Sequence, residues 1–194
     1  MKHKFLCLGD SNTFGYNPCS PLSDRYPRSV RWTGILNSSD RWEIVNGGEN
    51  GREIPYRDWE LDRAKKAIHY AQPEAVLIML GTNDLLGSLA ADTVTCRMET
   101  MLNCLLEEWT DRSRLLLASP VRMVRGLWVL DPELPDRVRH LAHRYDAMAE
   151  QLGISFVDAG SWEVTLAFDG VHLTPEGHKV VAEGMNQALQ KLFP

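Results

Sequence analysis

The sequence predicts a three-layer α/β/α sandwich, a doubly wound fold built around a parallel sheet of five strands. Short, continuous apolar runs alternate along the chain with longer amphipathic stretches. Continuous runs, unlike alternating ones, indicate strands that are buried on both faces, as in a parallel sheet covered by helices. The 194 residues show no internal repeat and no linker, so we predict a single domain over residues 1–194.

The five apolar runs are the predicted strands. In chain order they are KFLCL (4–8), WEIVN (42–46), AVLIML (75–80), RLLLAS (114–119) and ISFVDA (154–159). The third run is the most regular, because it is wholly apolar and is closed by Gly81.

Amphipathic stretches between and after these runs predict five helices. They cover residues 29–37, 58–71, 92–109, 134–153 and 174–193. Asp92 and Thr174 are the expected N-caps, the second of them followed by a proline at the first helical position. Gly153 is the expected C-terminal stop, because glycine accepts the left-handed conformation in which many helices end.

Composition restricts the classes of partner. The net charge is 21 − 26 = −5 and no basic run occurs, which argues against nucleic acid or an anionic membrane as the main partner. The first apolar run, Phe5–Leu8, is shorter than the ~7–15 residues of a signal-peptide core. No stretch approaches the ~20 apolar residues of a membrane span. Four cysteines without Cys-x-x-Cys spacing favour a reduced, cytoplasmic protein.

Polar and glycine-rich segments follow the predicted strands, at the edge where doubly wound sheets bind ligands. They are Gly9–Asn12, Gly47–Arg52, Gly81–Asp84, Ser119–Val121 and, before the last helix, Asp169–His172. Because the carboxyl ends of parallel strands meet at one edge, we expect these segments to converge there.

Three of these residues can supply the parts of a serine esterase. Ser11 would be the nucleophile, His172 the general base, and Asp169 the carboxylate that orients the imidazole. The Ser11 N–H, an N–H near Gly51 and the Asn83 amide can donate to the oxyanion of the tetrahedral intermediate. Asp10, Asn12 and Asp84 are expected to support the turns around them.

Four short blocks carry a resemblance to a known family. GDSNTFGY, ENGR, GTND and DGVH resemble, in that order, the blocks of the SGNH (GDSL-type) hydrolases. VRWTGIL and VLIMLGTNDLL further resemble the arylesterase-like branch, which includes acyltransferases and perhydrolases. The resemblance implies a flavodoxin-like sheet, a Ser11–His172–Asp169 triad, an oxyanion hole with Gly51 and Asn83, and neither metal nor cofactor.

Two departures from the family pattern concern the substrate and the assembly. Glu53 follows Arg52 where many relatives carry a small hydroxyl residue. The segment from Gly51 to Gly81 is shorter than in the arylesterase-like branch, where it shapes the pocket and the subunit contacts. The resemblance therefore leaves open the substrate and whether the chain forms a homo-oligomer.

The function predicted from these residues is hydrolysis of small esters through an acyl-enzyme, with water or another acceptor releasing the acyl group. Short-acyl, aryl and acetyl-sugar esters all fit. One alternative is a metal-dependent phosphoesterase that would use Asp10, Asn83, Asp84, Asp169 and His172 as ligands. The other is a non-catalytic carbohydrate- or acyl-binding module on the same fold.

Two further features have more than one interpretation. Residues Val121–Leu130 follow the fourth strand and would form either a helix on the core or an apolar wall, lid or subunit contact. The five remaining histidines are expected at exposed helix or terminal positions: His3, His69, His140, His143 and His178. His140 and His143 have the spacing of a metal pair but lack a visible third ligand.

Overall fold

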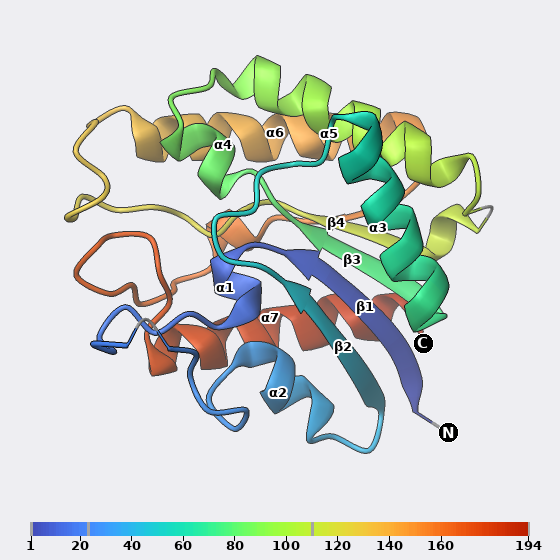
Figure 1. The fold of residues 1–194 in the computed structure, drawn as a ribbon, viewed down its shortest axis with the longest axis horizontal. Coiled ribbons are helices and arrows are strands. Elements are labelled where there is room, and N and C mark those ends of the chain that lie inside the picture. Colours follow the sequence, from blue (N-terminus) through green and yellow to red (C-terminus); the bar gives the residue numbers. More distant parts are fainter. Residues whose placement is uncertain (1, 23, 110, 194) are drawn as a thin grey trace.

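The computed structural model describes residues 2–22, 24–109 and 111–193 and has a five-stranded, wholly parallel sheet at its centre (Figure 1). The strands are β1 (His3–Gly9), β2 (Trp42–Gly48), β3 (Ala75–Met79), β4 (Leu115–Ala118) and β5 (Ser155–Val157). Their order is β2-β1-β3-β4-β5, so the chain reverses its winding direction between β1 and β3. The predicted fold class is confirmed.

The register of the sheet brings the strand ends level. Gly9 at the end of β1 pairs with Gly48 of β2 and Met79 of β3, and Ala118 of β4 pairs with both Met79 and Val157. The segments that follow all five strands therefore start along one edge. Two short helices begin at that edge, α1 (Ser11–Phe14) after β1 and α4 (Thr82–Leu86) after β3.

Helices cover both faces of the sheet. One face carries α2 (Trp32–Asn37) and α7 (Pro175–Leu192), and the other carries α3 (Asp58–Ala71), α5 (Ala91–Leu106) and α6 (Leu134–Leu152) (Figure 1). Three-residue 3₁₀ turns, η1 (Arg112–Arg114) and η2 (Ala159–Ser161), flank β4 and β5. In the described ranges no helix combines the length and apolarity needed to cross a membrane.

Strand residues alternate between two separate cores. Phe5 and Cys7 pack toward α2 and α7, whereas Leu6 and Leu8 pack toward α3, α5 and α6. Both faces of the strand are therefore buried, which explains why its sequence is continuously apolar. All four cysteines are unpaired, and burial raises the pKa of the Cys7 thiol to about 12.

Helix ends agree with the sequence at two of the three proposed caps. Gly153 ends α6 in the left-handed region, with φ 67°, and Thr174 caps α7 by accepting a hydrogen bond from the Gly177 N–H. The proposed cap at Asp92 is wrong, because Ala90 occupies the N-cap position of α5. The Asp92 carboxylate instead lies 2.7 Å from the Arg144 guanidinium of α6, so it joins two helices.

The predicted exposure of His178 is also wrong. Its side chain is fully buried on the inner face of α7, with its ring edge-on to Tyr26 at 5.4 Å between centroids. Nδ1 accepts a long hydrogen bond of 3.4 Å from the Trp32 N–H, and Nε2 has no partner among the described residues. Burial, together with the nearby Arg31 guanidinium, lowers the pKa of His178 to about 4.

This buried imidazole makes the stability of the fold sensitive to acid. The native ring stays neutral to about pH 4, whereas in the unfolded chain it takes up a proton below about pH 6.5. The contribution of this pKa difference to the free energy of unfolding is therefore complete above pH 6.5 and is lost as the pH falls toward 4. Between pH 7 and 4.5 the wild type should lose about 2 to 3 kcal/mol more unfolding free energy than His178→Gln, measured by urea denaturation. The exposed His143→Gln is the control and should behave as wild type; equal acid losses in wild type and His178→Gln would contradict the effect.

Candidate active site

Helix α1 presents Ser11 at the carboxyl edge of the sheet. Gly9 allows the helix to fold back onto the strand end, because a Cβ there would lie 2.1 Å from the Thr13 Oγ1. Asp10 is the N-cap, and its Oδ1 accepts a hydrogen bond of 2.9 Å from the Asn12 N–H. Ser11 then occupies the first turn, where backbone N–H groups have no partner within the helix.

A tight turn before α7 holds Asp169 against His172. The Asp169 Oδ1 accepts hydrogen bonds from the N–H groups of Val171 and His172, both at 2.9 Å. Gly170 has φ 82°, which glycine adopts readily, and a Cβ there would lie 2.1 Å from the Val124 carbonyl oxygen. The other carboxylate oxygen, Oδ2, accepts a hydrogen bond of 2.8 Å from the His172 Nδ1.

The structure brings Ser11, His172 and Asp169 together in one hydrogen-bonded chain. The Ser11 Oγ lies 2.9 Å from the His172 Nε2, and all three residues are at most 5% exposed. An ionised carboxylate can only accept, so His172 carries its proton on Nδ1 and leaves Nε2 free to accept the serine proton. This arrangement can convert a hydroxyl into a nucleophile.

Asn12 fixes the position of His172 relative to α1. Its side-chain amide donates to the Val171 carbonyl at 3.1 Å and accepts from the Leu173 N–H at 3.0 Å. Both neighbours of the histidine are therefore hydrogen-bonded to the residue that follows Ser11. The indole N–H of Trp32 donates to the Asn12 carbonyl at 3.0 Å, so the inner face of α2 supports the same contact.

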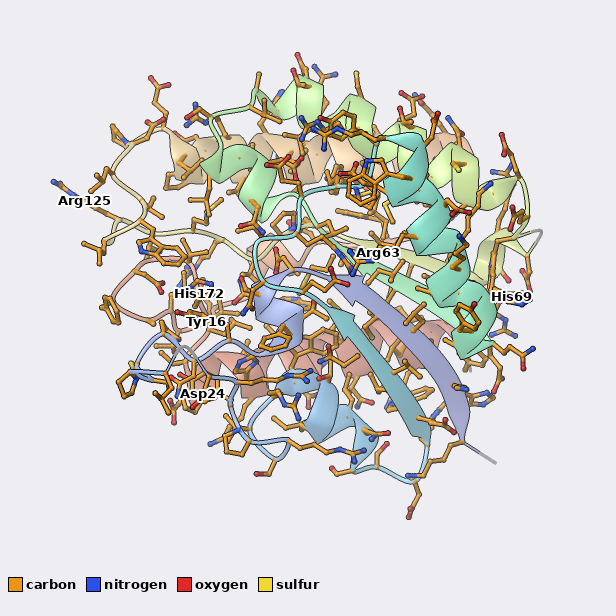
Figure 2. The ribbon with its side chains drawn as sticks, in the orientation of Figure 1. Tyr16, Asp24, Arg63, His69, Arg125 and His172 are labelled. Atoms are coloured by element: carbon orange, nitrogen blue, oxygen red, sulfur yellow. The ribbon has the colours of Figure 1, made fainter. Side chains whose placement is uncertain are left out.

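Two aromatic rings flank the imidazole, a contact that could not be predicted from the sequence. Tyr16 lies 4.7 Å from the His172 ring and Trp128 lies edge-on at 5.0 Å, measured between ring centroids. Figure 2 shows Tyr16 directly beside His172, on the loop that leaves α1. Trp128 belongs to the segment Val121–Leu130. The apolar residues of that segment were the one signal in the sequence that could have placed Trp128 at the site.

Residues Val121–Leu130 form a loop, so the interpretation of this segment as a helix is wrong. Its backbone hydrogen-bonds to the turn that carries Asp169: the Trp128 N–H donates to the Asp169 carbonyl at 3.0 Å, and the Val124 N–H donates to that of Gly170 at 3.0 Å. Several apolar side chains remain exposed around this contact: Val124, Leu127, Trp128, Leu130 and Phe168. They form an apolar rim, and one of its members, Trp128, contacts the imidazole.

The loop that carries Gly51 lies against the end of β1, because the Glu49 N–H donates to the Gly9 carbonyl at 3.1 Å. Gly51 has φ 72° and an open space where a Cβ would stand. The Asn83 side chain, at the start of α4, donates to the Arg52 carbonyl at 2.9 Å, which brings the two proposed oxyanion residues onto adjoining segments. One amide proton of Asn83 is used in this bond, and the second is left for another acceptor.

Arg52 was not identified in the sequence as a site residue, yet it anchors this loop. Its guanidinium donates to the Gly47 carbonyl at 2.6 Å and the Gly9 carbonyl at 3.4 Å, and it pairs with Glu49. Burial lowers the pKa of Arg52 from its usual range, with Glu49 opposing that effect. The residue after Gly51 is thereby bound to the ends of β1 and β2.

Asp84 and Glu53 belong to an ionic link behind the loop. The Asp84 carboxylate accepts from the Ile54 N–H at 3.1 Å and lies 2.8 Å from the Arg97 guanidinium, which also pairs with Glu53 at 2.8 Å. Burial raises the pKa of Asp84, and the bond to Arg97 opposes that effect. The glutamate that departs from the family pattern thus has a structural partner.

The proposed phosphoesterase ligands do not assemble into a metal site. Within residues 2–22, 24–109 and 111–193, no group of three or more His, Cys, Asp or Glu side chains is placed to hold a metal ion. Asp10 caps α1 and Asp84 binds Arg97, so their oxygens are already engaged. His140 and His143 form no such group either.

A separate cavity of about 400 Å³ lies behind the Gly51 loop, against α3. Its lining includes the apolar side chains of Leu8, Leu80 and Met101 and the charged side chain of Arg63, which is labelled in Figure 2. None of the Ser11, His172 and Asp169 side chains lines it. The hydrogen-bonded serine therefore sits outside this cavity, among the loops at the sheet edge.

Comparison with known proteins identifies the family. A family model, described as the GDSL-like lipase/acylhydrolase family, matches residues 7–180. The chain belongs to this family. It is a carboxylic ester hydrolase.

Solved structures with similar folds agree with this family assignment. A carbohydrate acetylesterase family member from Sinorhizobium meliloti is 25% identical, with a TM-score of 0.82 and 99% of each chain covered. An aryl esterase from M. smegmatis is 24% identical and shares the fold, with a TM-score of 0.81 and coverage of 98% of this chain and 100% of that one. No curated protein sequence matches the chain.

A substitution at Gly126 tests whether the contact between the Val121–Leu130 loop and the turn that carries His172 positions the histidine of this acylhydrolase. A Cβ at this residue would lie 2.5 Å from both the Asp169 carbonyl carbon and the Gly170 nitrogen. Gly126→Ala should lower kcat/KM for p-nitrophenyl acetate by about ten- to a hundredfold, because small displacements of reacting groups are costly. Arg125→Ala, at an exposed residue of the same loop that is not part of the apolar rim, should stay within about twofold of wild type. Wild-type kcat/KM in a folded Gly126→Ala protein would show that this contact does not matter.

Proposed function

We propose that this chain is a serine esterase in which Ser11 is the nucleophile, His172 the general base and Asp169 the residue that orients the imidazole. The observation that carries the proposal is the continuous hydrogen-bonded chain, with 2.9 Å from the Ser11 Oγ to the His172 Nε2 and 2.8 Å from Nδ1 to Asp169. These are the distances at which a proton can be transferred directly. A non-catalytic binding module would not require this chain to be intact.

The first half of the reaction forms an acyl-enzyme. The Ser11 Oγ attacks the carbonyl carbon of the ester while His172 Nε2 takes its proton, and Asp169 stabilises the resulting imidazolium. The oxyanion accepts hydrogen bonds from the N–H groups of Ser11 and Gly51 and from the Asn83 amide. Loss of one such donor typically costs about 2.7–4 kcal/mol in the transition state.

The second half releases the acyl group. The alcohol leaves with the proton that His172 received, so the imidazole is neutral again. Water then attacks the acyl carbon, gives a proton to His172, and the Ser11 oxygen leaves and is reprotonated. An alcohol or another acceptor in place of water would complete an acyl transfer with the same proton balance.

The proposed substrates are small esters with a short acyl group, including aryl esters and acetylated sugars. Tyr16 and Trp128 confine the space around the imidazole, at centroid distances of 4.7 and 5.0 Å. The similar structure named as a carbohydrate acetylesterase family member supports a short acyl group. The apolar rim, which contacts the imidazole through Trp128, suits an aryl or acyl carbon surface.

Ser11→Ala tests the nucleophile. Removing the hydroxyl should lower kcat for p-nitrophenyl acetate by at least about 10⁴-fold, since loss of a triad serine removes the covalent route. Intact-mass spectrometry after treatment with a fluorophosphonate should show one adduct on the wild type and none on Ser11→Ala. Ser29→Ala, at an exposed serine, should retain both activity and adduct. Substantial turnover or labelling of folded Ser11→Ala would refute the serine mechanism.

A chain-length series tests the proposed acyl specificity. The kcat/KM of the wild type should fall as the p-nitrophenyl ester is lengthened from acetate to octanoate, because the flanking rings restrict long acyl chains. Trp128→Ala should reduce the ratio of acetate to octanoate activity by about tenfold, the effect of one or two methylene contacts. A wild-type preference for octanoate would contradict this part of the proposal and leave the nucleophile unaffected.

A further inference from the structure

A cluster of three arginines lines a cavity to which the proposed triad side chains, Ser11, His172 and Asp169, do not contribute. It lines an open cavity of about 320 Å³ between the segment before α2, α2 itself and the edge strand β2. The charged and polar side chains that line it are Arg25, Arg28, Arg31, Thr33, Asn37 and Asn46. No carboxylate is among the described residues that line it, although the whole chain has 26 acidic against 21 basic residues.

The positive charges in this cavity are uncompensated. Among the described residues none of Arg25, Arg28 and Arg31 forms an ion pair. Burial and then the Arg31 charge lower the pKa of Arg25, and burial and then the Arg28 charge lower that of Arg31. Like charges held together without a counterion cost free energy, which an anion would offset.

Contacts with neighbouring segments hold two of the arginines in place. The Arg25 guanidinium lies over the Phe14 ring, 4.3 Å from its centroid, and its Nε donates to the Phe14 carbonyl. The Arg31 side chain packs against Gly15, where a Cβ would lie 2.4 Å from its Cγ and Cδ. Less side-chain entropy is therefore lost when these groups bind a ligand.

The neutral groups of the cavity also offer donors. The Thr33 Oγ1 accepts a hydrogen bond of 2.7 Å from the Asn46 amide, so its own proton is available to a ligand. The Asn37 side-chain oxygen accepts from the Ile44 N–H at 3.0 Å, which leaves its amide protons free to donate. A ligand in this cavity therefore meets mainly donors.

We infer that the cavity lined by Arg25, Arg28 and Arg31 binds a phosphoryl group, either as free phosphate or as part of a small phosphomonoester. Guanidinium groups bind phosphate oxygens in a bidentate manner, and a tetrahedral dianion can engage several of them at once. A monocarboxylate has one charge and a single plane of oxygens, so it matches three arginines less well. This inference does not depend on the proposed serine mechanism.

Isothermal titration calorimetry tests the site. Inorganic phosphate, glycerol 3-phosphate and acetate are titrated into the full chain at pH 8 and constant ionic strength. Both phosphoryl ligands should bind with one site per chain, and acetate should bind at least about tenfold more weakly. Tighter binding of glycerol 3-phosphate would identify a phosphomonoester as the ligand, and equal or weaker binding would identify free phosphate.

The variants locate the binding. Arg28 is exposed, so Arg28→Gln should fold normally and weaken phosphate binding by about tenfold, as expected for loss of a charge-assisted hydrogen bond. Arg139→Gln, an exposed change of the same charge on α6, should bind as wild type. No phosphate binding in the wild type, equal binding of acetate, or unchanged binding by Arg28→Gln would each overturn the inference. Ser11→Ala should bind phosphate normally, which separates this result from the test of the esterase mechanism.

Discussion

The side-chain amide of Asn12 is the contact on which the rest of the site depends. It bonds to the Val171 carbonyl, 159 residues along the chain, and to the Leu173 N–H, 161 residues along, on either side of His172. Because both partners are backbone atoms, the amide fixes the main chain of the turn as well as one side chain. The indole of Trp32 holds the Asn12 carbonyl in turn, so the separation between Ser11 and His172 is set by the packed core beneath α1.

Three buried aspartates lie near the carboxyl edge of the sheet, and their surroundings give them different roles. Asp169 has three donors, two backbone N–H groups and the imidazole, which compensate for the loss of water around its charge. Asp84 has a guanidinium partner in Arg97. Asp10 caps α1, and burial raises its pKa. These different arrangements explain why the same residue type does not gather here into a metal-binding cluster.

Much of the fold could be predicted, because continuous apolar runs and 3.6-residue periodicity are local signals. Helix α4 was missed because five residues are too few to show a period. The burial of His178 could have been predicted, since it lies three, four and seven residues before the buried Val181, Ala182 and Met185. The contacts of His172 with Tyr16 and Trp128 could not, because loops from distant parts of the chain bring these rings together.

Two clamps of different chemistry converge on the end of β1. Asn12 holds the histidine turn on one side, and on the other Arg52 reaches the carbonyls of Gly9 and Gly47 while its own carbonyl accepts from Asn83. Hydrogen bonds thus connect the segments of the proposed nucleophile and of the proposed oxyanion donors to the end of β1. Donors fixed in this way need not reorganise when charge develops on a substrate oxygen, which is where preorganised sites gain most of their advantage over water. Ser11 follows β1, Asn83 follows β3 and the Gly51 loop follows β2. All three therefore start beside the point, between β1 and β3, where the winding of the sheet reverses.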